Sequence, residues 1–123
     1  MTKIAVLISG QLRNWKLALD SQKWFWSTSG SEVDYFVHTW DYSMDRPACS
    51  KEYNFRPVRH DEFKEFCDAY KPIDSILDDK KQQYFYDNDH WSSLFYSLTR
   101  TILMKRKHEL ESNFEYDVAF KTR

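Results

Sequence analysis

Apolar residues recur along the chain in two ways, as short continuous runs and as sets spaced by three or four residues. The run at 3–9 alternates too little for a strand with one wet face, which indicates a strand covered on both sides, as in a parallel sheet. A second run at 33–40 is rich in β-branched and aromatic residues and predicts a second strand. A short run at 74–78 predicts a third, and the apolar stretch from about 116 predicts a fourth, buried strand.

The spaced sets predict helices between these strands. Apolar positions recur at helical intervals over about 13–27 and over about 90–112. A further set predicts a helix that begins with Asp61 as its N-terminal cap and ends before Pro72. The stretch 41–59 shows neither pattern, and we interpret it as a long loop of the kind that often carries function.

Strands and helices therefore alternate in the order β-α-β-α-β-α-β. A strand, a helix and a following parallel strand connect with a right-handed crossover almost without exception. We expect an α/β fold, a three-layer sandwich around a mainly parallel sheet of about four strands in the order 3-2-1-4.

Composition narrows the class of protein. The 123 residues fit a single domain, 1–123, and 41% apolar with 18% aromatic residues indicate a packed body. The 18 basic and 19 acidic residues nearly cancel, which excludes the strong field expected of a nucleic-acid or membrane-surface binder. No apolar run is long enough to span a bilayer. Cys49 and Cys67 allow one disulfide, but the chain has no secretory signal, so a reduced cytoplasmic protein is the default.

The first candidate site follows directly from the first strand and comprises Ser9, Gly10, Gln11 and Arg13. Gly10 permits a tight turn, and the free N–H groups at the start of the next helix can face an anion. Arg13 is suited to a bidentate contact with a phosphate. The alternative is an ordinary strand-to-helix turn with a surface arginine.

A second candidate site, His38, Trp40 and Asp41, ends the second strand. Because the first two strands are expected to be parallel neighbours, this site should lie at the same edge of the sheet as the Gly10 turn. An acidic group there commonly holds a ribose hydroxyl, which suits Asp41, and Trp40 is suited to stacking on a base. The alternative places Trp40 in the core and makes Asp41 a loop cap.

Lys121 and Arg123 form a third candidate site at the end of the last strand. Side chains alternate along a strand, so both point to one face. Because unpaired buried charge is very costly, they must reach solvent, a carboxylate or a bound phosphate. With Arg13 they would form a cationic patch for a diphosphate. The alternative is a frayed terminus with two solvated cations.

The sequence contains no motif for metal binding, nucleophilic catalysis or a glycine-rich phosphate-binding loop. The histidines and cysteines show no metal-binding spacing, and neither a nucleophile elbow nor a P-loop occurs. Two glycines are too few for the glycine-rich loop of dinucleotide-binding domains. The carboxylate pairs Asp78-Asp79 and Asp87-Asn88-Asp89 are interpreted as solvated turns.

Four blocks carry a resemblance to a known family: 3–13, 33–41, 92–97 and 114–123, which read KIAVLISGQLR, VDYFVHTWD, SSLFYS and FEYDVAFKTR. Together, in this order and spacing, they resemble the N-terminal part of a family of GT-A-like glycosyltransferases of bacteria and large phages. The resemblance implies a Rossmann-like half of a GT-A fold that binds a nucleoside-diphosphate sugar. The nucleotide would lie over the tip of the first strand and near the His38–Asp41 segment.

The resemblance also implies a divalent metal, Mn or Mg, held by an aspartate just beyond the strand that ends at Arg123. Family members continue past this arginine into that acidic residue and a second, acceptor-binding half. We therefore expect a nucleotide-sugar-binding half domain truncated at its C-terminus. The metal is expected only in the complete protein, and this chain is expected to hold none.

The sequence thus predicts the donor-binding part of a glycosyltransferase, with little or no turnover from this chain alone, so its status as an enzyme stays open. The alternatives are a non-catalytic α/β binding or interaction module and a small nucleotide-binding regulator. Nucleic acid and a membrane span are not expected. A sheet edge left open after Arg123 favours a homodimer through that edge.

Overall fold

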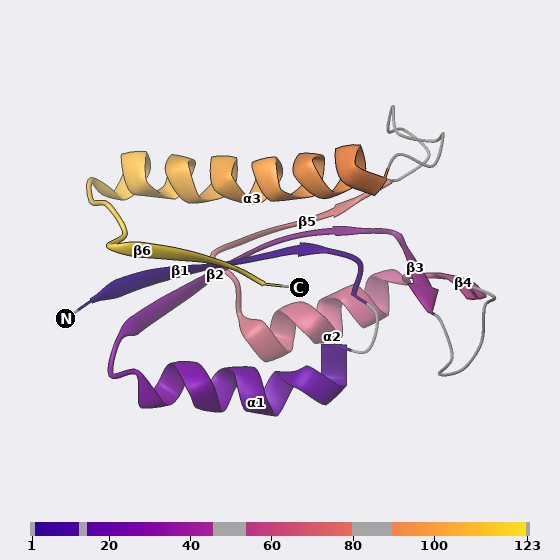
Figure 1. Ribbon diagram of the computed structural model, residues 1–123, viewed down its shortest axis with the longest axis horizontal. Helices are drawn as coiled ribbons and strands as arrows, with labels where there is room; N and C mark the ends of the chain where they lie inside the picture. Colours follow the sequence, from indigo (N-terminus) through magenta and orange to yellow (C-terminus); the bar gives the residue numbers. More distant parts are fainter. Residues whose placement is uncertain (1, 13–14, 46–53, 80–89, 123) are drawn as a thin grey trace.

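The computed structural model describes residues 2–12, 15–45, 54–79 and 90–122 (Figure 1). In chain order the elements are β1 (Lys3–Gly10), α1 (Trp15–Thr28), β2 (Glu32–Trp40), β3 (Tyr42–Asp45), β4 (Asn54–Pro57), α2 (His60–Tyr70), β5 (Asp74–Asp78), α3 (His90–Ser112) and β6 (Val118–Thr122). The predicted strands and helices are confirmed, with small differences at their ends.

Four parallel strands form the main sheet, in the order β5-β2-β1-β6. Numbered by their order along the chain within this sheet, they run 3-2-1-4, as predicted. Helices α1 and α2 cover one face, and α3 runs along the other, which gives three layers (Figure 1). The fold is therefore the predicted α/β sandwich.

The central strand β1 is buried on both faces because its side chains alternate between two cores. Ile4, Val6 and Ile8 join the core under α1 and α2, where Trp15 meets Phe66 edge to face at a centroid distance of 5.1 Å. Each aliphatic side chain buried in this way stabilises the fold by roughly 1.5–3 kcal/mol. This explains the unbroken apolar run at 3–9.

The second core lies between the sheet and α3. Ala5 and Leu7 of β1 pack there with Phe36 of β2 and Met104 of α3. Alternate side chains of β1 and β2 therefore point to the two helical layers. Ser9 and His38 continue this alternation at the carboxyl ends of the two strands.

Three sequence predictions are corrected. The stretch 41–59 is not a plain loop, because β3 and β4 pair antiparallel in a separate two-stranded sheet. Asp61 does not cap α2. The N-cap is Arg59, which has an extended backbone and no side-chain capping bond, and Asp61 instead accepts a hydrogen bond from the N–H of Glu62. The last strand is not buried: as the outer neighbour of β1, β6 is exposed along most of its length.

Candidate functional site

Polar residues end three neighbouring strands at the carboxyl edge of the sheet. In the parallel register, Ser9 pairs with His38 and Gly10 with Thr39, while Trp40 pairs with Asp78 at the end of β5. The expected meeting of the Ser9–Gly10 turn and the tip of β2 at one edge is therefore confirmed.

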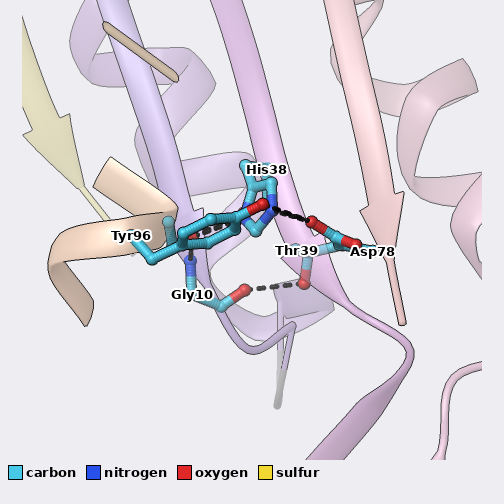
Figure 2. Close-up of polar contacts among 6 residues, drawn as sticks. Gly10, His38, Thr39, Asp78 and Tyr96 are labelled. Atoms are coloured by element: carbon cyan, nitrogen blue, oxygen red, sulfur yellow. Dashed lines mark hydrogen bonds and ion pairs between the residues drawn. The ribbon is translucent and has the colours of Figure 1, made fainter. Parts of the chain in front are cut away.

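Gly10 combines an unusual backbone conformation with open space. Its φ angle is +110°, which L-residues with a side chain rarely adopt. A Cβ atom added to Gly10 would have no other atom within 4 Å. The Gly10 N–H donates to Ser97 Oγ at 2.9 Å. The Gly10 carbonyl accepts from Thr39 Oγ1 at 2.6 Å (Figure 2). The glycine backbone is thus fixed in place while the space beside its Cα stays open to a ligand.

His38 links the strand ends to α3. Its Nε2 lies 3.0 Å from Asp78 Oδ2 (Figure 2). Its Nδ1 lies 2.7 Å from Ser97 Oγ. A carboxylate only accepts, so Nε2 carries the proton and Nδ1 accepts from the Ser97 hydroxyl, whose oxygen in turn accepts from Gly10. We call this chain of Gly10, Ser97, His38 and Asp78 the edge network.

The imidazole of His38 is neutral in this setting. Burial lowers the pKa of His38, and the nearby charge of Arg100 lowers it further, against an opposing effect of the Asp78 carboxylate. Because the ring is fully buried, the charged form would lose its hydration. Neutral His38 is also the form that the Ser97 hydroxyl can donate to.

Serine, histidine and aspartate are the residue types of a hydrolytic triad, but the edge network does not fit that role. Ser97 is fully buried, and its hydroxyl already donates to the ring and accepts from a backbone N–H. A nucleophile must reach a substrate carbonyl. The network therefore serves to fix the strand ends against α3. The interpretation of Asp78 as a solvated turn residue is wrong, because it ends β5 and binds His38.

Trp40 belongs to the core and is not presented to solvent. It is 2% exposed, and its ring stacks on Tyr96 at a centroid distance of 5.7 Å and an angle of 27°. Tyr96 also places its hydroxyl 3.4 Å from Asp78 Oδ2. A base cannot reach the indole face that Tyr96 covers, so the core alternative describes Trp40 correctly.

Gln11 and Asp41 lie where the small β3–β4 sheet meets the main one. Gln11 Nε2 donates to the hydroxyl of Tyr42 at 3.3 Å. The Asp41 N–H donates to the Asp78 carbonyl at 2.9 Å, and the Asp41 carbonyl accepts from the N–H of Val58 at 2.8 Å. The β3–β4 sheet is therefore tied to the carboxyl edge through both residues.

Two buried polar atoms stand out near this edge. Within the described residues, Ser9 Oγ and Arg100 Nε have no hydrogen-bond partner. By the alternation of β1, Ser9 lies on the α3 side of the sheet, the side that carries Arg100. Buried polar groups in native proteins nearly always have partners, so each of these atoms calls for a partner that the described residues do not supply.

Lys121 lies on the exposed edge strand and pairs in register with Leu7 of β1. It is therefore beside β1 but set back from Gly10 by the length of three residues. Arg13 and Arg123 lie outside the described residues, so the cationic patch stays a prediction. Lys121 itself is exposed, in agreement with the argument that it cannot be core.

The predicted site residues do not include Ser97, Tyr96 or Arg100, although Tyr96 and Ser97 lie in the 92–97 block that carries the resemblance. All three lie on one helix whose spacing marks it as amphipathic, and nothing in the local sequence tells which polar residues face the strand tips. Asp78 carried a better signal, because it ends a predicted strand that should lie next to His38.

No three His, Cys, Asp or Glu side chains come together as a metal-binding group in the described part of the chain. Nor does any helix within the described ranges combine the length and apolar character that crossing a membrane requires.

These features define a parallel α/β domain with a polar carboxyl edge. No protein-family model matches the chain, and no curated protein or solved structure is significantly similar to it.

Proposed function

We propose that this chain is the nucleotide-sugar-binding part of a glycosyltransferase, which transfers a sugar from a nucleoside-diphosphate donor in the complete protein. The observation that carries the proposal is Gly10, which ends the central strand with a φ of +110° and open space beside its Cα. A ligand can approach such backbone closely, as phosphates do at glycine turns.

The order of the strands supports a ligand at this place. The chain leaves β1 for β2 on one side, and it reaches β6 on the other side by way of α3 across the opposite face (Figure 1). Such a reversal opens a crevice outside the carboxyl ends of the strands, where open α/β sheets bind their ligands. Ser9 and Gly10 end the strand beside that reversal.

The chemistry gives each candidate residue a role. Negative charge develops on the leaving diphosphate, and cations must meet it. We assign that role to Arg13, Lys121 and Arg123, with hydrogen bonds from the backbone beyond Gly10. Asp41 would hold a ribose hydroxyl, and the divalent metal, Mn or Mg, would be bound by residues of the complete protein.

A thermal-shift screen of nucleoside diphosphates and their sugars, with and without manganese, tests the proposal. Ligand at tenfold its Kd stabilises the native state by about 1.4 kcal/mol through mass action. We expect a rise in melting temperature with at least one nucleoside diphosphate and little further gain from manganese. A strong dependence on manganese would instead place metal ligands within this chain.

The first testable prediction concerns Lys121. Replacing Lys121 with Ala should weaken nucleoside-diphosphate binding about threefold to tenfold, the usual effect of losing one partly exposed charge-assisted contact. The matched control is Lys107→Ala, because Lys107 is exposed on α3, whereas Lys105 is largely buried and bound to Glu109. Calorimetric titration gives both dissociation constants. Equal losses in the two variants would reduce the effect to nonspecific charge.

A non-catalytic α/β binding or interaction module is the second candidate function. It is favoured by the edge network, in which Ser97 satisfies Gly10 and His38, and His38 satisfies Asp78. Trp40 is also covered, by Tyr96. A screen in which no nucleoside diphosphate or nucleotide sugar raises the melting temperature would select this candidate.

A further inference from the structure

The edge strand β6 presents a row of residues to solvent. It pairs with β1 on one side and with no other described strand. Val118 is 39% exposed and Phe120 is 46% exposed. A sheet edge that combines open backbone groups with apolar side chains is a template for a further strand.

The backbone of β6 has a defined set of outward groups. The N–H of Asp117 donates to the Lys3 carbonyl at 2.9 Å, so this residue turns its backbone toward β1. Because the direction alternates along a strand, Ala119 and Lys121 also face β1, whereas the N–H and C=O groups of Val118 and Phe120 face outward.

We propose that two copies of this chain associate through β6, antiparallel about a twofold axis, with Ala119 opposite the partner's Ala119. In this register Val118 lies opposite the partner's Phe120, and these outward-facing residues exchange both backbone hydrogen bonds. Asp117 lies opposite the partner's Lys121. The twofold axis repeats each contact, so the seam has two ion pairs and two apolar pairs.

Asp117 and Lys121 are complementary in this register. Shifting the strands by two residues keeps outward groups opposite outward groups, but it places Ala119 opposite the partner's Asp117 or the partner's Lys121, which breaks both Asp117–Lys121 pairs. One of these shifts sets Lys121 opposite the partner's Glu115 instead, so the register rests on the Asp117–Lys121 and Val118–Phe120 pairs together and not on charge alone. Asp117 is able to make the pair, because Lys3 N–H occupies its Oδ2 at 2.8 Å and the carboxylate has a second oxygen.

The apolar side of the seam favours a second copy as the occupant. By alternation Val118 and Phe120 face α1, where the Phe120 ring lies 5.1 Å from Trp26 and the Trp26 ring lies 4.9 Å from Phe25. Phe25 is more than half exposed. Pairing would extend this aromatic row across the twofold axis and join the two sheets into one. The strand is thus complementary to itself in charge, apolarity and backbone pattern.

Sedimentation equilibrium from micromolar to hundreds of micromolar protein tests the proposal, with a reversible dimer expected for the unchanged chain. Lys121→Asp should raise the dimer dissociation constant about tenfold or more, because both cross-strand pairs become repulsive. The double variant Asp117→Lys with Lys121→Asp should restore dimerisation. Lys64→Asp, a reversal of an exposed charge on α2, is the control and should leave the constant unchanged.

Amide hydrogen exchange followed by NMR supplies a readout that does not depend on variants. Protection of the Val118 and Phe120 amides should rise with protein concentration, while that of Ala119 and Lys121 should not change. A monomer at all concentrations would overturn the proposal. So would an assembly larger than a dimer, or a double variant that dimerises no better than Lys121→Asp.

Discussion

At the scale of single residues, the proposed ligand site depends on Gly10. The backbone angle at Gly10 requires glycine. Crowding by neighbouring residues does not require it, because the space beside the Cα is open. Gly30 differs in kind: its φ of +68° lies in the range of the left-handed region, which asparagine tolerates. The conformation at Gly10, and not crowding, is what a side chain would disturb.

This difference predicts unequal costs for the same substitution. Gly10→Asn should lower the free energy of unfolding by about 1–3 kcal/mol, the cost of a strained backbone conformation. Gly30→Asn should cost clearly less. Urea denaturation of the two variants measures both effects, and equal losses would show that the Gly10 turn relaxes without strain.

Between elements, the edge network joins three strands to one helix. Gly10 of β1, His38 of β2 and Asp78 of β5 are connected through Ser97 of α3. A neutral imidazole is required for this pattern, since the ring accepts at Nδ1 and donates at Nε2. The strand tips are therefore held in register by a histidine whose pKa burial lowers from its usual value near 6.5.

The edge network predicts a pH dependence of stability. Because burial holds the pKa of His38 below its usual value near 6.5, the unfolded chain takes up this proton first as the pH falls. The contribution is fully present above about pH 6.5 and is lost as the pH falls toward the folded-state pKa, with a slope of up to about 1.4 kcal/mol per pH unit.

Denaturation of the unchanged chain and of His38→Gln between about pH 7.5 and about pH 5.5 measures this contribution. The variant should show a shallower loss of stability with acid. His60→Gln, at an exposed position on α2, serves as the control and should keep the full slope. Parallel slopes for the unchanged chain and His38→Gln would assign the pH dependence elsewhere.

Much of the element pattern could be predicted from sequence because it depends on local signals. The run at 3–9 is apolar on both faces, and β1 is covered on both faces for that reason. The β3–β4 sheet was not predicted, because each of its strands has only four residues and Pro57 is typical of a loop. The prediction that β6 is buried was wrong. Its composition resembles that of a central strand, but the topology places it at the edge of the sheet, where it is exposed.

The candidate site was predictable only in part, for a related reason. Ser9, Gly10 and His38 follow from strands whose ends sequence can locate. Ser97 and Arg100 come from the middle of α3, and only the packing of that helix across β1 and β2 brings them to the edge. Trp40 shows the reverse case, since an aromatic residue at a strand tip looks available until Tyr96 is seen to cover it.

At the scale of the whole molecule, the two edges of the sheet matter in different ways. The carboxyl edge gathers polar groups from three strands and leaves the backbone at Gly10 open, which suits a small anionic ligand. The lateral edge at β6 is apolar and charge-complementary to itself, which suits a second chain. Lys121 is assigned to both surfaces, so loss of dimerisation and loss of nucleotide binding should be separable only in variants that leave Lys121 unchanged.

The central claim is that a nucleoside diphosphate binds at the carboxyl edge beside Gly10, and an NMR titration of the isotope-labelled chain tests it most directly. Uridine, guanosine and adenosine diphosphates would be added in turn, and amide shifts would be followed residue by residue. The account predicts that the Gly10 and Gln11 amides shift with saturation for at least one of them, while Lys3 and Glu32 at the amino ends of the strands do not. Saturable shifts confined to residues away from the carboxyl edge, or none with any of the three, would contradict it.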